Sequence, residues 1–158
     1  MLLPMLAALA AATHTVDLPT LFANELPAVK TRTAVPVLLP QRFPSDFDKL
    51  YASGTGHRRS WSLGLAAAPH CGGATACFVA DFEGRRGGRP FGRSRVALAH
   101  GRTGWFTPLS CGGSCAPPRI EWRERAVTFS IQANVGTGHT ERRLLIRMAN
   151  SAIRHGPR

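Results

Sequence analysis

Four cysteines form two tight pairs in the sequence, and thiols at such spacing can bridge or bind a metal. Cys71 and Cys77 stand in HCGGATAC, and Cys111 and Cys115 stand in SCGGSC. Each pair has Gly-Gly after its first cysteine, and glycine lets a short loop turn tightly enough for a disulfide. Two local bridges, Cys71–Cys77 and Cys111–Cys115, are therefore the simplest of the three possible pairings. Pairing between the clusters is the alternative, and it would constrain the unfolded chain more.

A four-thiolate zinc site is the competing interpretation of the same residues. Structural zinc sites favour two to four residues between paired ligands. Five residues intervene in the first pair and three in the second, so only the second pair fits well. Neither cluster is a C-x-x-C at a helix start, which redox catalysis would favour. The sequence thus predicts structural disulfides, an oxidising compartment and neither metal nor cofactor.

The basic residues are the second group with recognisable chemistry. The chain carries 20 Lys+Arg against 9 Asp+Glu, a formal net charge of +11, and only Lys30 and Lys49 are lysines. Guanidinium groups pair with phosphates and carboxylates. An arginine-rich stretch at residues 84–95, expected to be a hairpin loop, and a stripe on a C-terminal helix together form a candidate anion-binding surface. Its residues are Arg85, Arg86, Arg89, Arg93, Arg95, Arg143, Arg147 and Arg154.

Such a surface suits an anionic cell-surface polymer, the headgroups of a membrane surface or an acidic protein partner. Nucleic acid is disfavoured because Phe91 is the one aromatic residue among the loop arginines, and single strands need stacking platforms. The alternative is that the loop is merely solvated and mobile.

Catalytic patterns are weak. Asp81 and Glu83 would share one face of a strand, as acid–base chemistry requires, or they balance neighbouring arginines. The six histidines show no metal-ligand spacing and no evident carboxylate partner. The segment Gly112-Gly113-Ser114-Cys115-Ala116 only approaches a nucleophile motif. No catalytic, cofactor-binding or metal-ligating residue is predicted, and the enzyme question stays open, leaning against one.

Three tryptophans allow another function. Trp61, Trp105 and Trp122 could line a pocket for a small apolar ligand between sheet and helix, which would make the protein a carrier or sensor. The alternative is that they form the core under the helix.

Alternating apolar and polar residues predict the elements that position these groups. Segments around Trp61–Leu65, Phe78–Glu83, Val96–Leu98, Trp105–Phe106, Ile120–Trp122 and Val127–Ile131 have the period of half-buried antiparallel strands. Residues 35–39 suggest an edge strand because Pro36 cannot donate to a ladder. Residues 45–50 suggest a helical turn.

Two helices complete the expected fold. Residues 17–26 predict a short helix capped by Asp17 and ended by Pro27. From Thr140, a plausible N-cap, to the stop at Gly156-Pro157, the apolar residues cover about half the helix circumference. Arg143, Arg147, Asn150 and Arg154 lie opposite. The fold class is therefore α+β: an antiparallel sheet of about five to seven strands, covered on one face by the C-terminal amphipathic helix, with a short N-terminal helix.

The C-terminal third resembles a domain of unknown function found in bacterial sporulation lipoproteins and in the extracytoplasmic part of some anti-sigma factors. The likeness lies in Ile120-x-Trp122, in Val127-x-Phe129-x-Ile131, and in Leu144-Leu145 followed by Met148-Ala149-Asn150-Ser151-Ala152-Ile153. It covers about 35 residues, all of them at positions expected in the core. This chain differs by lacking an upstream membrane segment and by carrying two cysteine pairs. The resemblance implies an extracytoplasmic bacterial α+β domain and transfers no catalytic residue.

The N-terminal residues carry a targeting pattern. Residues 1–12, MLLPMLAALAAA, are apolar, too short to span a bilayer, and end in a small-residue cleavage site, although the basic n-region is missing. We expect a signal peptide over residues 1–12 and one secreted or periplasmic domain over residues 13–158, with no membrane span in the mature chain.

Overall fold

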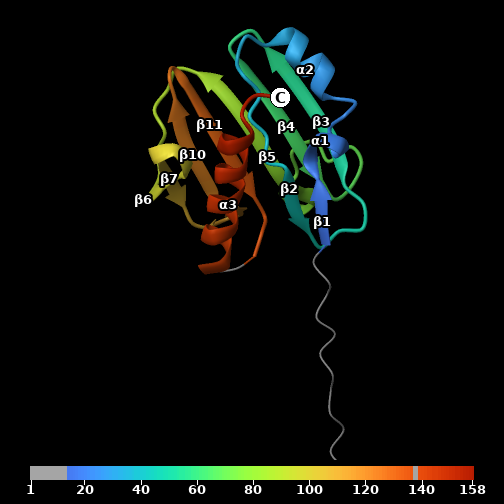
Figure 1. Ribbon diagram of the computed structural model, residues 1–158. Helices are drawn as coiled ribbons and strands as arrows, with labels where there is room; N and C mark the ends of the chain where they lie inside the picture. Colours follow the sequence, from blue (N-terminus) through green and yellow to red (C-terminus); the bar gives the residue numbers. More distant parts are fainter. Residues whose placement is uncertain (1–13, 137–138) are drawn as a thin grey trace, which may run out of the picture.

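A seven-stranded antiparallel sheet forms the centre of the molecule (Figure 1). The computed structural model describes residues 14–136 and 139–158. The strands run in the order β3-β4-β5-β11-β10-β7-β6 across the sheet. Their bounds are β3 (Tyr51–His57), β4 (Ser60–Ala66), β5 (Phe78–Arg86), β6 (Ser94–Ala97), β7 (Thr103–Thr107), β10 (Arg119–Glu124) and β11 (Val127–Ala133). The predicted α+β class is confirmed.

Smaller elements surround this sheet. Two short ribbons pair β1 (His14–Asp17) with β2 (Arg42–Ser45), and β8 (Ser110–Cys111) with β9 (Cys115–Ala116). The helices are α1 (Leu18–Leu21), α2 (Leu26–Arg32) and α3 (His139–His155), with 3₁₀ turns η1 (Thr75–Cys77) and η2 (Ala99–Gly101). Within the described residues, no helix has the length and apolar character needed to cross a membrane. The predicted signal peptide, residues 1–12, lies outside the described residues.

One face of the sheet, called the inner face, is buried beneath α3 and the N-terminal segments (Figure 1). Leu145, Ala149 and Ala152 of α3 are 0% exposed, so the small alanines bring the helix close to the strands. Trp122 of β10 stacks on its cross-strand partner Phe129, with ring centroids 5.5 Å apart. The indole N–H of Trp61 donates to the Pro36 carbonyl at 2.9 Å. Trp61 and Trp122 are therefore core residues.

The N-terminal helix expected over residues 17–26 is wrong in extent. Asp17 caps α1 as expected, because its carboxylate accepts the Thr20 N–H at 3.0 Å. The chain then leaves the helix after Leu21 and starts α2 at Leu26. Pro27 lies in the first turn of α2 instead of ending a helix, since a proline there gives up an N–H that has no partner.

Two further expectations for the N-terminal third are wrong. Residues 35–39 form no strand, only a bridge from Leu38 to Pro157, because their apolar side chains are buried in the core without a strand partner. Residues 45–50 form no helical turn: Ser45 ends β2, and its hydroxyl accepts the Phe47 N–H at 3.0 Å.

Strand β3 was not predicted, because Gly54 and Gly56 interrupt its apolar pattern. Their place in the fold explains them. A Cβ at Gly56 would lie 2.6 Å from the Val29 carbonyl oxygen of α2, so the missing side chain lets this helix pack directly on β3.

The arginine-rich stretch is not a hairpin loop, because β5 and β6 are separated by three strands. Residues 87–93 instead cross the face opposite α3, called the outer face. Three hydrogen bonds mark the path: the Thr128 hydroxyl donates to the Gly87 carbonyl at 3.0 Å, the Phe91 N–H to Glu121 Oε2 at 2.9 Å, and the Arg93 N–H to the Phe106 carbonyl at 2.9 Å. We call residues 87–93 the crossover loop.

The sequence correctly predicted which face of α3 is buried in the core and where the helix ends. Gly156, with φ of 70°, follows the last turn as predicted. The helix begins at His139, so Thr140 lies inside the first turn and not at the N-cap. Asn150 does not belong to the solvent stripe, because its side-chain oxygen accepts the Ala99 N–H at 2.6 Å and so anchors η2.

Candidate anion-binding site

The eight arginines predicted to form one anion-binding surface are divided between two sides of the sheet. Arg89 and Arg93 lie in the crossover loop on the outer face, and Arg85 of β5 points to the same face. Arg95 lies in β6, and Arg86 ends β5 opposite Val127 of the inner face. Arg143, Arg147 and Arg154 are exposed on α3, which covers the inner face. The loop and the helix stripe are thus separate basic regions.

A different group of arginines meets at one end of the sheet. A pocket of about 610 Å³ is lined there by four arginines and a single carboxylate. These residues are Arg86, Arg102, Arg123, Glu124 and Arg125, and we call the site the arginine pocket. One carboxylate among four guanidinium groups leaves three positive charges in excess.

Backbone and side-chain contacts bring these residues together from three parts of the chain. The Arg86 N–H donates to the Arg59 carbonyl at 2.8 Å, which ties the end of β5 to the exposed β3–β4 turn. Arg102 follows η2 and forms a 2.8 Å ion pair with Glu124. Arg123 Nε donates to the Arg125 carbonyl at 3.1 Å within the β10–β11 turn.

Arg125 has an unusual backbone for its residue type, with φ of 52°. The left-handed region costs an L-residue about 1 kcal/mol, and glycine or asparagine is the usual choice. The turn would therefore form more easily with glycine or asparagine at position 125, yet this position carries an arginine. Such local strain is often found where a side chain is needed for function.

The other walls of the arginine pocket are apolar. Leu38 and Pro36 come from the segment after α2, Phe129 from β11, and Pro157 from the C-terminal end, which lies at the same end of the molecule as α2 (Figure 1). Apolar walls lower the local dielectric, so an anion here would pair more strongly with the guanidinium groups than on an open surface.

Of these four arginines, sequence reasoning selected only Arg86. Arg102 stands in one turn and Arg123 and Arg125 in another, and none belongs to a dense arginine run. The one available signal was RERA, a charged turn between two segments that alternate as strands do. Recognising the cluster also requires knowing that β5 pairs with β11, which the sequence did not reveal.

No family model matches the chain, and no match was found among curated proteins or solved structures. The function is therefore inferred from the residues of this chain.

The cysteines pair locally, as the simplest interpretation predicted. Cys71 is bonded to Cys77 and Cys111 to Cys115. Pairing between the clusters and the four-thiolate zinc site are thus both excluded by the structure. Within residues 14–136 and 139–158, no group of three or more His, Cys, Asp or Glu side chains could hold a metal ion.

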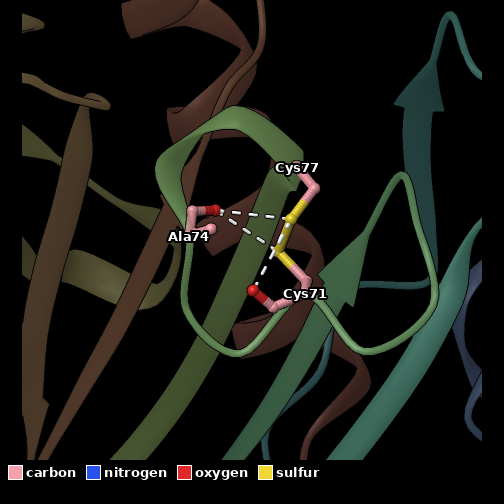
Figure 2. Close-up of a disulfide and its surroundings, with 3 residues drawn as sticks. All are labelled: Cys71, Ala74 and Cys77. Carbon is pink, nitrogen blue, oxygen red and sulfur yellow. Dashed lines mark hydrogen bonds between the residues drawn. A yellow bond between two sulfur atoms is a disulfide. The ribbon is translucent and has the colours of Figure 1, made fainter.

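The Cys71–Cys77 bridge closes a compact surface loop after β4 (Figure 2). The Ala74 carbonyl oxygen points at the bridge, 3.3 Å from Cys71 Sγ and 3.5 Å from Cys77 Sγ. The Ala74 N–H donates to the Cys71 carbonyl at 3.0 Å. Gly72 and Gly73 have φ of 58° and 80°, which explains why glycines follow the first cysteine.

Asp81 and Glu83 share the outer face of β5, as their spacing predicted. Burial and then the neighbouring Glu83 raise the pKa of Asp81 to about 6, while Arg119 pulls it down. The side chain is only half-buried, so solvent screens part of this effect. The other carboxylate on this face, Glu83, acts here by raising the pKa of Asp81, which is an effect of charge and does not by itself support acid–base catalysis.

This raised pKa has a consequence for stability. Ionisation of Asp81 opposes folding, because its pKa is about 6 in the folded chain and 3.8 as the ordinary value. Its unfavourable contribution therefore grows as pH rises from about 4 to about 6 and stays constant above that, at about 1 kcal/mol after screening. We expect Asp81→Asn to raise the free energy of urea unfolding at pH 7 but not at pH 4. A difference between the two proteins that does not change with pH would contradict this.

Proposed function

We propose that this protein is an exported, non-enzymatic binding module that holds a phosphate-bearing anionic ligand in the arginine pocket. The supporting observation is the convergence of Arg86, Arg102, Arg123 and Arg125, from three chain segments, around one carboxylate that Arg102 already neutralises. Guanidinium groups match phosphate oxygens in geometry and stay charged at every physiological pH.

The proposal of binding without catalysis rests on what lines the pocket. Its one ionisable acid, Glu124, is engaged with Arg102, and its remaining polar side chains are arginines that cannot shuttle protons. Export is part of the same proposal. Two disulfides suit an oxidising compartment, and residues 1–12 have the composition of a signal sequence. Outside the cytoplasm, phosphate is carried by anionic surface polymers and by lipid headgroups.

The test is a titration with short-chain polyphosphate at several salt concentrations. The pocket variant is Arg86→Ser with Arg125→Gly. The matched control is Arg143→Ser with Arg147→Ser on α3, which removes the same charge at exposed residues that do not line the pocket. We expect affinity to fall steeply with salt, because counterions are released on binding. The pocket variant should bind at least about tenfold more weakly, since each charge-assisted hydrogen bond contributes about 1.5–3 kcal/mol.

Arg125→Gly is expected to fold, because glycine relieves the backbone strain at this turn. Weaker binding would then report the lost guanidinium groups. Equal losses in the pocket variant and the helix control would contradict the proposal, as would no binding at any salt concentration. Vesicles of phosphatidylglycerol, compared with phosphatidylcholine, then distinguish a lipid headgroup from a soluble polymer as the source of the phosphate.

A further inference from the structure

A second pocket lies on the outer face at the opposite end of β5 from the arginine pocket. Its volume is about 490 Å³. The floor is formed by two residues from each of three neighbouring strands: Tyr51 and Ser53 of β3, Gly64 and Ala66 of β4, and Phe78 and Asp81 of β5. The two small residues of β4 form the bottom of a trench, and the larger side chains stand on either side.

The cross-strand register arranges these side chains in two rows. Ser53 and Asp81 flank Gly64, while Tyr51 and Phe78 flank Ala66. The second row depends on a register shift between Leu65 and Ala66, which turns Phe78 to the outer face although the sequence pattern placed it with Phe82. One row is therefore polar and the next aromatic.

The loop closed by Cys71–Cys77, which is drawn in Figure 2, forms the wall of this pocket. His70, Gly72 and Ala74 of this segment line it. Because the disulfide and the backbone hydrogen bond from Ala74 to Cys71 fix the loop, the wall exists before any ligand binds. Preformed walls reduce the entropy that a ligand must lose on binding.

Two oxygen atoms converge above Gly64. A Cβ placed on this glycine would lie 3.0 Å from Asp81 Oδ1 and 3.0 Å from Ser53 Oγ. Both oxygens therefore border the same small space, which is open only because residue 64 has no side chain. A single nitrogen donor entering from the pocket can reach both of them at hydrogen-bond distance.

The charge of this space favours a cation. Asp81 is ionised at neutral pH, and Glu83 stands two residues along the same face of β5. The basic residue that acts on Asp81 is Arg119, which lies two strands away beyond Gln132. The Tyr51 ring also accepts a cation from within the chain, since Lys49 Nζ lies 5.0 Å from its centroid.

We propose that this pocket, the disulfide-loop pocket, binds a small primary alkylammonium ligand. The ammonium group donates to Asp81 and Ser53 above Gly64, and the alkyl chain lies over Ala66 between Tyr51 and Phe78. The site is independent of the proposed anion-binding function and carries the opposite charge preference.

The test is a titration of the full chain with n-butylammonium, monitored by backbone amide NMR shifts. A parallel titration uses 1-butanol, which has a similar alkyl chain but no charge. We expect shifts at Gly64, Ala66 and Gly73 with n-butylammonium only. Asp81→Asn should weaken binding about tenfold or more, since a hydrogen bond to a charged group is lost. Gly64→Ala should also weaken it by filling the space between the two oxygens.

The matched control is Asp48→Asn, which removes an exposed carboxylate outside the pocket and should leave the affinity unchanged. Equal binding of n-butylammonium and 1-butanol would overturn the proposal, because the pocket would then act only as an apolar surface. Unchanged affinity in Asp81→Asn, or no binding of n-butylammonium, would overturn it as well. Asp81→Asn is expected to fold, since it removes a charge whose ionisation opposes folding.

Discussion

Replacement of Glu121 by alanine is expected to lower the free energy of unfolding by about 2–4 kcal/mol. The Glu121 side chain is 1% exposed, although it points to the outer face, because the crossover loop covers it. Its Oε2 accepts the Phe91 N–H at 2.9 Å, and Oε1 lies 3.5 Å from Arg119 Nη1. Alanine leaves the Phe91 N–H without its acceptor and Arg119 without its counter-charge.

Two readouts separate this anchoring role from general destabilisation. Urea unfolding gives the stability loss, and limited trypsin digestion under native conditions reports opening of the crossover loop by cleavage after Arg93. Glu121→Gln should lose only part of the stability, because an amide oxygen still accepts the Phe91 N–H. Asp48→Ala, an exposed acid, is the control and should change little. A Glu121→Ala protein that is as stable and as resistant to trypsin as the control would show that the loop is held by other contacts.

Local signals explain why parts of this fold were predictable. Helix α3 has an uninterrupted apolar face, and β10 and β11 alternate strictly, so one segment suffices to identify each. The disulfides were predictable for the same reason, since each closes a loop whose glycines adjoin the cysteines. The sequence did not predict strand β3, because the close approach of α2 requires glycines on the inner face of this strand. Sequence periodicity does not record such a contact.

The two candidate sites depend on pairing between distant strands, which explains why the sequence did not reveal them. The density of arginine in residues 84–95 indicated a basic loop, whereas the pairing of β5 with β11 brings Arg86 next to the turn that carries Arg125. Asp81 and Glu83 were recognised as sharing a face. Their position relative to Ser53 and Gly64 follows only from the register of β3, β4 and β5. The dense run of arginine therefore indicated that the surface is basic, but it did not indicate where in the fold arginine side chains meet.

Replacement of Phe82 by alanine is expected to have the largest effect on stability, about 3–5 kcal/mol. Phe82 is 0% exposed at the centre of β5. Its ring meets Phe22 and Phe43 edge-on, with centroids 6.1 Å and 6.3 Å away. These two contacts join the N-terminal segments to the inner face of the sheet, so the substitution removes both a large buried volume and two aromatic pairs.

Phe82→Leu retains most of the volume and should cost less than about 1.5 kcal/mol beyond the lost aromatic contacts. Phe91→Ala removes a ring that is 63% exposed and serves as the control, with an expected change within about 0.5 kcal/mol. Urea unfolding measures all three, and hydrogen exchange locates the change. Exchange in Phe82→Ala should accelerate first over residues 14–45, whose attachment Phe82 supports. A loss no larger than that of Phe91→Ala would contradict this.

The same variant connects the core to the proposed function. Pro36 and Leu38, which line the arginine pocket, belong to the N-terminal segments that Phe82 helps to hold. Polyphosphate affinity should therefore fall in folded Phe82→Ala protein although every arginine remains, because the apolar wall that concentrates the field of the guanidinium groups is less well fixed. Unchanged affinity would show that the charges alone, without that wall, account for binding.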